Sequence, residues 1–307
     1  MRNKFADIFY NLGKNDSKLH LVVADISPAG SISRFREEFP NRFINTGVAE
    51  QVMIGMVAGM CQRGLRPFAY TIATFSLFRP YEFVRNDLCY QNLPVTIVGI
   101  GGGVTYSTLG GTHHAMEDIS IASSIPNMNI IAPCDPNETA EATKWCAKQK
   151  KGPVYLRLGK AGEPNLSQSA DENWKFGKIR TIRKTSGKIA VITYGAIASI
   201  AQQVTDNLEL SGKNPSLFFC STIKPLDKEK IITLLKNYKK ILVIEETVPS
   251  GSLGEKIQVL AYQIGSRSKI FSFTLKDKFI HFYGNHTQLL QKHGLDVKNI
   301  INKINVK

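Results

Sequence analysis

The sequence predicts an α/β protein with two consecutive domains, each a parallel sheet covered by helices on both faces in three layers. Two observations support this fold class. Short runs rich in β-branched residues alternate with helical patterns along the 307-residue chain, and one polar stretch divides that alternation into two rounds. The length is also that of roughly two domains, each able to bury its own core.

The first domain is expected over residues 1–165. Its apolar runs are each a few residues long and are separated by longer segments with helical periodicity, the order typical of β-α-β units. The expected strands lie at 19–24, 66–72, 95–100, 128–132 and 153–158. The expected helices lie at 48–63, 78–91, 116–124 and 136–149.

Residues 166–187 are expected to form a surface linker, because the polar stretch that begins near Glu163 has little apolar periodicity. A second α/β domain is expected over 188–307. Its strands are predicted near 188–193, 215–220, 240–245 and 269–274. Its helices are predicted near 196–210, 227–237 and 252–264.

Ligands of open parallel sheets bind at the carboxyl ends of the strands. Asp25, the turn Gly101–Gly103 and Arg157 fall at or near such ends. The glycine turn lacks the third glycine of the dinucleotide fingerprint, which disfavours a Rossmann cofactor. The chain also contains no P-loop motif and no Gly-x-Ser-x-Gly elbow.

The net charge of +14 is concentrated in the second half of the chain. Residues 1–174 carry 17 basic and 16 acidic side chains, whereas 175–307 carry 22 and 9. Such a field attracts phosphorylated molecules, nucleic acid or an acidic partner. Because no nucleic-acid-binding motif accompanies it, we interpret it as a solvated surface and predict no nucleic-acid partner.

Composition excludes other classes of protein. No window reaches the ~18 apolar residues of a membrane span, and no signal-peptide core follows the first residues, so we predict a cytoplasmic chain without a membrane partner. The five cysteines are odd in number and contain no Cys-x-x-Cys pair. We interpret them as buried thiols and predict no metal site built by this chain.

Glu50 is the residue with the most information about chemistry. It is the one carboxylate in the early turns of a long apolar helical run, Val48 to Met60. If that helix is apolar all round, the carboxylate is buried and needs a partner or a proton. The alternative is a solvated acid that favours the helix N-terminus.

The segment Asn45-Thr-Gly-Val-Ala-Glu50 resembles the Gly-Ile-Ala-Glu-Gln signature of transketolases and 1-deoxy-xylulose-phosphate synthases. The resemblance continues in the same order through 94–99 and 110–139, which include Gly-Gly-Thr-His-His-Ala-Met-Glu-Asp. It extends at lower density through 221–227, Glu245-Glu246 and the turn 251–254. It covers nearly the whole chain and implies a pyrimidine-binding domain followed by a transketolase C-terminal-like domain.

The resemblance implies that Glu50 holds the aminopyrimidine ring of thiamine diphosphate, the cofactor that performs the carbanion chemistry. It implies an aromatic pocket for that ring from Phe75, Phe78 and Tyr81, whose spacing is also typical of plain core packing. Asp25 and Ile26 match a segment that lies beside the cofactor, although Asp25 is equally typical of a strand-end turn.

Substrate residues follow from the same resemblance. His113 matches a histidine that faces the reacting carbonyl and exchanges protons with substrate oxygens. Arg157 matches an arginine that holds the substrate phosphate, and Arg2 matches a second one. The chain departs from the family at Leu109, Gly101 and Ala29, where transketolases often have an acid, a histidine and a serine. The departures put the ordinary pentose-phosphate substrates in doubt.

The family's diphosphate-binding domain carries a Gly-Asp-Gly motif, which this sequence lacks. We therefore expect the C-terminal subunit of a split transketolase, inactive alone. Its partner would be an N-terminal, diphosphate-binding subunit that binds Mg²⁺ or Ca²⁺, and the assembly is expected to be α2β2. The expected reaction moves a two-carbon ketol unit between sugars or sugar phosphates.

Three alternatives remain. A 1-deoxy-xylulose-phosphate-synthase-like condensation would use pyruvate and release carbon dioxide. A 2-oxoacid dehydrogenase β-subunit has a similar domain order, but usually carries His-Ser-Gln where this chain has Thr112-His113-His114. The third alternative is a non-catalytic binding module that docks through its basic second domain.

Overall fold

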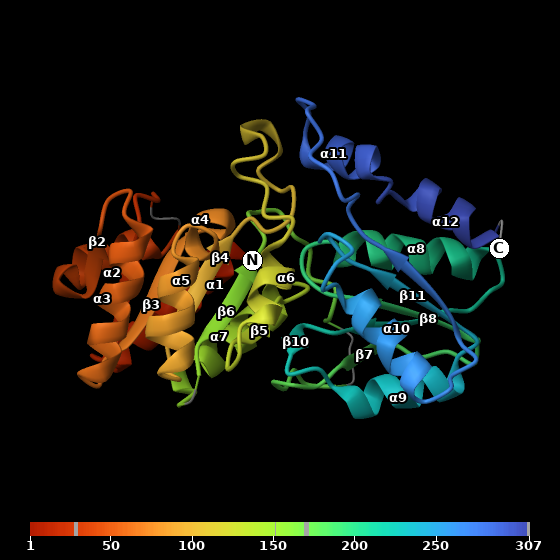
Figure 1. The fold of residues 1–307 in the computed structure, drawn as a ribbon, viewed down its shortest axis with the longest axis horizontal. Coiled ribbons are helices and arrows are strands. Elements are labelled where there is room, and N and C mark those ends of the chain that lie inside the picture. Colours follow the sequence, from red (N-terminus) through yellow and green to blue (C-terminus); the bar gives the residue numbers. More distant parts are fainter. Residues whose placement is uncertain (28–29, 151, 169–171, 306–307) are drawn as a thin grey trace.

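The computed structural model describes residues 1–27, 30–150, 152–168 and 172–305. It contains two sheets, each with its own helices, which lie side by side along the longest axis of the molecule (Figure 1). The predicted class, two consecutive α/β domains, is confirmed. Each sheet is mixed rather than purely parallel, because each carries one antiparallel edge strand that the sequence pattern did not predict.

The first sheet has seven strands in the order β10-β5-β6-β4-β3-β1-β2. Its central strands are buried on both faces, as expected of strands covered by helices, and every residue of β4 and β6 is buried. The six mutually parallel strands are β1 (Leu19–Val23), β2 (Phe43–Asn45), β3 (Arg66–Ile72), β4 (Thr96–Ile100), β5 (Asn129–Ile131) and β6 (Val154–Leu158).

Alternate residues of β1 belong to the two cores that flank this sheet. Leu21 packs in one cluster with Phe5 and Phe9 of α1, whereas Val22 packs in the other with Met53 of α3. The helices of this half are α1 (Arg2–Asn15), α2 (Ile32–Glu38), α3 (Glu50–Gln62), α4 (Ala73–Leu77), α5 (Tyr81–Phe83), α6 (Asp118–Ser124) and α7 (Pro136–Lys148), with short 3₁₀ turns η1 (Pro40–Arg42) and η3 (Ser107–Leu109).

The single helix expected at 78–91 is wrong in its limits. Helical structure begins at Ala73 with α4, is interrupted at Pro80, and continues through α5 into a π-helical segment, η2 (Val84–Tyr90). Proline lacks the N–H that would continue the helical hydrogen bonds, which explains the break. The interruption lies beside the residues expected to hold the cofactor ring.

The second sheet has five strands in the order β12-β11-β8-β9-β7. Its parallel strands are β8 (Ile189–Thr193), β9 (Ser216–Phe219), β11 (Lys240–Ile244) and β12 (Lys269–Phe273). Its helices are α8 (Ala198–Leu210), α9 (Lys228–Asn237), α10 (Leu253–Gln263), α11 (His286–His293) and α12 (Val297–Asn305). Neither α11 nor α12 was expected, although Asn285 caps α11 with a complete capping box.

The range expected to be a surface linker contains a strand. β7 (Arg180–Arg183) pairs antiparallel with β9 at the edge of the second sheet. Its Arg180 is buried and forms an ion pair with Glu138 of α7, with 2.8 Å between Nη1 and Oε1. Residues 169–171 of that range lie outside the described residues. The domain limits at 165 and 188 stay a prediction.

The two halves are joined by a strand as well as by side chains. β10 (Thr222–Lys224) comes from the second half of the sequence but pairs antiparallel with β5 of the first sheet. The Lys224 ammonium donates to the carbonyl oxygens of Ser123 and Ile125 at 3.0 and 2.6 Å. Three residues are too few to show a periodicity, so only the assembled fold reveals which sheet this segment joins.

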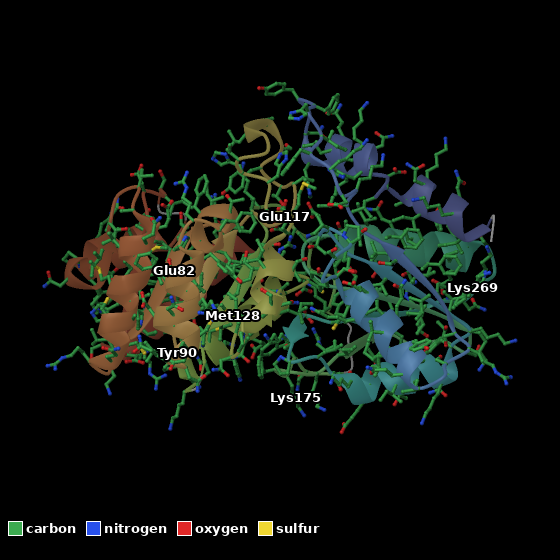
Figure 2. The ribbon with its side chains drawn as sticks, viewed as in Figure 1. Glu82, Tyr90, Glu117, Met128, Lys175 and Lys269 are labelled. Atoms are coloured by element: carbon green, nitrogen blue, oxygen red, sulfur yellow. The ribbon has the colours of Figure 1, made fainter. Side chains whose placement is uncertain are left out.

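Basic side chains extend from the surface of the second half, as Lys175 and Lys269 do in Figure 2. In the described part of the chain, no helix combines the length and the apolar character needed to cross a membrane.

Candidate functional site

Glu50 is the first residue of α3, and only 3% of its side chain is exposed. The alternative of a solvated acid is therefore wrong. This burial does not come from a helix that is covered on every side, because part of the apolar surface of α3 is exposed. Val52 and Met56 of α3 are 56% and 36% exposed, and Val48 just before the helix is 70% exposed. The carboxylate is enclosed at the start of a helix whose neighbouring apolar face lies open.

Arg79, which follows α4, covers that carboxylate. Its Nη1 lies 3.0 Å from Glu50 Oε1, and its guanidinium carbon lies 4.0 Å from the centre of the Phe75 ring. The Arg79 side chain remains 44% exposed. Arg79 was not among the predicted site residues, because an exposed arginine next to a proline carries no distinctive pattern in the sequence.

His113 completes a row of contacts that begins at Glu50. Its ring meets the edge of Phe75, with centroids 5.0 Å apart at 70°, and its Nδ1 lies 2.9 Å from Thr112 Oγ1. Burial, together with the charges of Arg79 and His114, lowers the pKa of His113 below its usual range. The neutral imidazole, which can accept a proton, is therefore favoured near neutral pH.

The other two aromatic residues of the expected pocket have different surroundings. Phe78 and Tyr81 are half-buried and pack against the main core cluster, and the Tyr81 hydroxyl lies 3.2 Å from Ser124 Oγ. The structure therefore brings Phe75, but not these two rings, into the row that joins Glu50 to His113.

Asp25 and Ile26 follow β1 at the same edge of the sheet as α3. Asp25 is exposed with a φ of 45°, and its backbone N–H donates to Asn45 Oδ1 at 3.0 Å. The same oxygen accepts from Gly47 N at 3.0 Å, so Asn45 ties this loop to the one that leads into Glu50. Ile26 is half-buried against the core on the α1 side.

The resemblance suggested that Arg157 faces a substrate phosphate, but the structure buries it against Asp118. Its side chain is only 5% exposed, and its Nε lies 2.7 Å from Asp118 Oδ2, to which Tyr155 also donates at 2.8 Å. Its Nη2 donates to the backbone oxygen of Glu246 at 2.8 Å. A Cβ at Gly102 would collide with this guanidinium. The glycine lets the arginine turn inward, where it joins the two domains instead of facing an open site.

Arg2 is a better candidate for an anion. It is half-buried at the start of α1, and its Nε is buried without a hydrogen-bond partner among the described residues. The Tyr70 hydroxyl is likewise buried and has no hydrogen-bond partner among the described residues. Burial raises the pKa of Tyr106, and the charge of Arg2 acts against that rise, which places the guanidinium near this second phenol.

Sequence reasoning noted Glu246 only as part of a family-like acidic pair. The structure places it at the domain junction, 1% exposed, where Oε1 accepts from the backbone N–H of Val104 and pairs with His286 Nε2, both at 2.8 Å. Burial would raise the pKa of Glu246, but His286, Arg157 and the Val104 N–H lower it overall. Because Val104 lies at the base of the loop that carries His113, this junction supports the candidate site.

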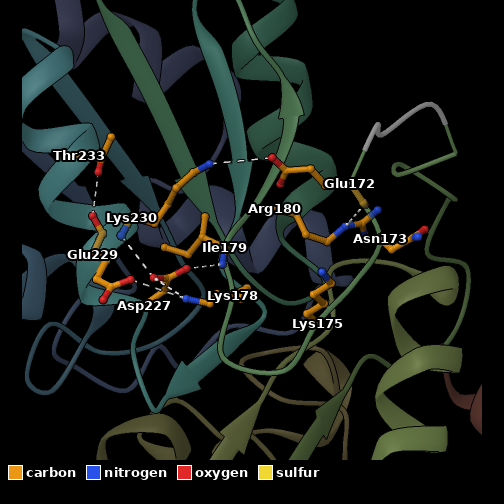
Figure 3. A pocket seen from close by; sticks show the side chains of 10 residues that line it. All are labelled: Glu172, Asn173, Lys175, Lys178, Ile179, Arg180, Asp227, Glu229, Lys230 and Thr233. Carbon is orange, nitrogen blue, oxygen red and sulfur yellow. Dashed lines mark hydrogen bonds and ion pairs between the residues drawn. The ribbon is translucent and has the colours of Figure 1, made fainter.

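A pocket of about 660 Å³ lies elsewhere, between β7 and α9 (Figure 3). Its lining side chains face one another with opposite charges. Asp227 accepts from the backbone of Ile179 at 3.1 Å, and Lys230 lies 4.0 Å from Glu172. The charges largely compensate one another, so we do not take this pocket as the reactive site.

Comparison with known proteins supports the resemblance over both domains. Residues 1–163 match the family model for the transketolase pyrimidine binding domain, and residues 177–300 match that for the transketolase C-terminal domain. This chain belongs to the transketolase family.

Among relatives of this transketolase-family chain, 1-deoxy-D-xylulose-5-phosphate synthase of Clostridium perfringens is 33% identical over 98% of the chain. The match spans 48% of that synthase, so the chain covers about half its length. One of the subunits of apulose-4-phosphate transketolase from Phocaeicola vulgatus is 30% identical, with 97% of this chain and 94% of that protein covered. A solved structure described as a split gene transketolase, inactive beta4 tetramer, has a TM-score of 0.88 and 27% identity, covering 99% of this chain and 96% of that one.

The structure shows the surroundings of two of the three residues that depart from the common transketolase pattern, Gly101 and Leu109. A Cβ at Gly101 would collide with the Tyr106 ring, so that ring takes the space of a side chain at position 101. Leu109, in place of an acid, is 51% exposed on the loop that carries His113. Ala29 lies outside the described residues.

The described residues contain no group of three or more His, Cys, Asp or Glu side chains arranged to hold a metal ion. The donor set at Glu50 does fit an aminopyrimidine. It combines an enclosed carboxylate, which can hydrogen-bond a ring nitrogen, with the Phe75 ring for stacking.

Proposed function

We propose that this chain is the C-terminal subunit of a split, thiamine-diphosphate-dependent transketolase that moves a two-carbon ketol unit between sugars or sugar phosphates. The observation that carries the proposal is the row Glu50, Phe75 and His113, which combines an enclosed carboxylate, a flat ring and a neutral imidazole. These residues come from separate segments of the sequence. Arg79 contacts both Glu50 and Phe75, and the Phe75 ring contacts that of His113. The similarity to the apulose-4-phosphate transketolase chain, over almost the full length of both proteins, supports the same assignment.

In this proposal thiamine diphosphate, when bound, supplies the nucleophilic carbon and stabilises negative charge during carbon–carbon cleavage. Glu50 holds a nitrogen of the aminopyrimidine ring and Phe75 supports one face of the ring. His113 exchanges a proton with the substrate oxygen, a role suited to its lowered pKa. Asp25 and Ile26 line the cofactor side of the site, and Phe78 and Tyr81 support the segment that carries Phe75.

Arg2 is the residue that we propose for an anionic group of the substrate, since its buried Nε has no hydrogen-bond partner among the described residues. Arg157 is proposed to act indirectly, by fixing the domain junction through Asp118 and Glu246. Leu109 removes the acidic contact of ordinary transketolases, so we propose acceptor and donor sugars other than the usual pentose phosphates.

The diphosphate and its Mg²⁺ or Ca²⁺ are proposed to bind to a separate N-terminal subunit. The exposed apolar face of α3 beside Glu50 is the natural surface for that subunit. We propose an α2β2 assembly. The structure described as an inactive beta4 tetramer supports the idea that this kind of subunit needs a partner for activity.

The test is co-expression with a neighbouring reading frame that encodes a chain of about 270 residues with a Gly-Asp-Gly motif. The purified pair is titrated with thiamine diphosphate and Mg²⁺ in a calorimeter, then assayed for ketol transfer from a panel of ketoses. Saturable binding and transfer that require both chains are expected. A pair that shows no saturable binding would support a non-catalytic module instead.

The synthase relatives favour one second candidate, a decarboxylating condensation of pyruvate with an aldose. Incubation of the pair with pyruvate and a sugar phosphate separates the two reactions. Carbon dioxide release without any ketose donor would replace the transferase assignment. The named relatives, a synthase and a transketolase subunit, favour both of these reactions over a 2-oxoacid dehydrogenase β-subunit.

A further inference from the structure

We propose that Arg79 competes with the cofactor ring for Glu50 and Phe75, so that its guanidinium must leave before an aminopyrimidine can bind. This inference rests on the proposed function, because it takes these two residues as the ring-binding pair. It adds a regulatory residue to that site and assigns to it a contact that a bound ring would replace.

The geometry of Arg79 supports this competition. A guanidinium is a flat cation that donates N–H groups in its plane and stacks on aromatic rings. Arg79 does both, with Nη1 at 3.0 Å from Glu50 Oε1 and its central carbon 4.0 Å from the Phe75 centroid. An aminopyrimidine would use the same carboxylate and the same ring. One flat group excludes the other because both need these two surfaces.

The contact between Arg79 and Glu50 meets a physical need of the buried carboxylate. Glu50 is only 3% exposed, and a buried carboxylate without a partner is strongly disfavoured. Arg79 supplies the missing charge until the ring arrives. It therefore stabilises the chain before assembly and lowers its apparent affinity for the cofactor.

Arg79 can leave without disturbing the fold. Its side chain is 44% exposed, and it lies between the end of α4 and Pro80, at the interruption of the helix. Its backbone oxygen accepts from Gln51 Nε2 at 3.5 Å, a contact that does not depend on the guanidinium. The guanidinium can therefore swing into solvent by rotation of its own side chain.

The test is calorimetric titration of the co-purified pair with thiamine diphosphate in the presence of Mg²⁺. Arg79→Met keeps the length of the stem and removes the charge. Ion pairs and cation–π contacts that are partly exposed are modest, so we expect the Kd to fall about three- to tenfold. Arg85→Met is the matched control. Arg85 is an exposed arginine nearby that donates to Asn86 at 2.7 Å, and its removal should leave the Kd unchanged.

Two further variants give readouts that a merely structural arginine would not change. Arg79→Lys retains the charge but cannot stack as a plane, so its Kd should lie between wild type and Arg79→Met. In a Glu50→Gln background the effect of Arg79→Met should shrink to less than about twofold, because the ion pair is already gone.

The outcomes separate the two proposals. If the wild-type pair binds thiamine diphosphate and Arg79→Met binds it equally or more weakly, the competition is refuted and the proposed function stands. If neither pair binds it, the proposed function fails and the competition fails with it.

Discussion

Glu246 of the second domain accepts a hydrogen bond from the backbone N–H of Val104 in the first, with 2.8 Å between oxygen and nitrogen. Val104 belongs to the loop that is closed by the bridge between Gly103 and Ala115 and that carries His113. A residue of the C-terminal domain therefore fixes the base of the loop that presents the candidate proton-transfer group.

Replacement of Glu246 by Ala should destabilise the chain by about 3 kcal/mol or more, because it leaves a buried N–H and the paired His286 without their acceptor. Urea unfolding measures the loss. Glu229→Ala is the control, since that side chain is 92% exposed and should change the free energy of unfolding by less than about 0.5 kcal/mol. Equal effects of the two substitutions would contradict a structural role for the junction.

The pair of Glu246 and His286 should make stability depend on pH. Burial lowers the pKa of His286, but Glu246 and Glu163 raise it overall, above the reference value of 6.5. The pKa of Glu246 is lowered overall from 4.5. The stabilisation is therefore complete between these reference values, and decreases as pH rises through the raised pKa of His286 or falls through the lowered pKa of Glu246.

His286→Asn isolates this contribution from the other histidines, including His293, whose pKa burial lowers to about 4. The difference in free energy of unfolding between wild type and variant should be largest near pH 6 and smaller by pH 9. A difference that is constant over this range would show that the histidine is not charged in the pair.

Glu50→Gln should abolish turnover of the assembled pair while the fold is retained, because the amide fills the same space but cannot act as the charged partner of the cofactor ring. Glu50→Asp should also lose activity through shorter reach. Circular dichroism verifies the fold, and the ketol-transfer assay gives the rate. Normal activity in Glu50→Gln would remove Glu50 from the mechanism.

Arg157→Met should destabilise the chain by about 3 to 5 kcal/mol, since it leaves the Asp118 carboxylate buried and unpaired. Adding Asp118→Asn should restore part of that loss, as measured by urea unfolding of the single and double variants. A stable Arg157→Met chain with only a raised KM for phosphorylated sugars would return Arg157 to the role that the sequence suggested.

Arg2→Met is expected to weaken substrate binding and to leave stability nearly unchanged, in contrast to Arg157→Met. Its guanidinium is half-buried at a helix start, and its Nε is without a hydrogen-bond partner among the described residues. Removal should therefore cost little stability, but raise KM for phosphorylated substrates about tenfold or more, as expected for the loss of a charged phosphate contact. An unchanged KM for every phosphorylated sugar would exclude Arg2 from the substrate site.

Local patterns predicted most of the parallel strands, since strands such as β4 and β6 are short runs dominated by apolar residues. They also placed Glu50 in the early turns of a helix. They did not predict that Pro80 interrupts the expected helix at 78–91. The proline was visible in the sequence, and its missing N–H accounts for the break, but the apolar pattern of the segment was given more weight. The short strands β7 and β10 were missed because three or four residues do not show a period.

The amino-acid sequence by itself determined the two α/β domains and the membership in the transketolase family, because both follow from the order and spacing of residues along the chain. It also singled out Glu50, Phe75 and His113 as candidate site residues. Only the tertiary structure decided that Arg157 turns inward to Asp118, that Arg79 covers Glu50, and that Glu246 crosses between domains. The direction of a charged side chain depends on partners that are distant in sequence, and folding alone brings those partners within hydrogen-bond distance.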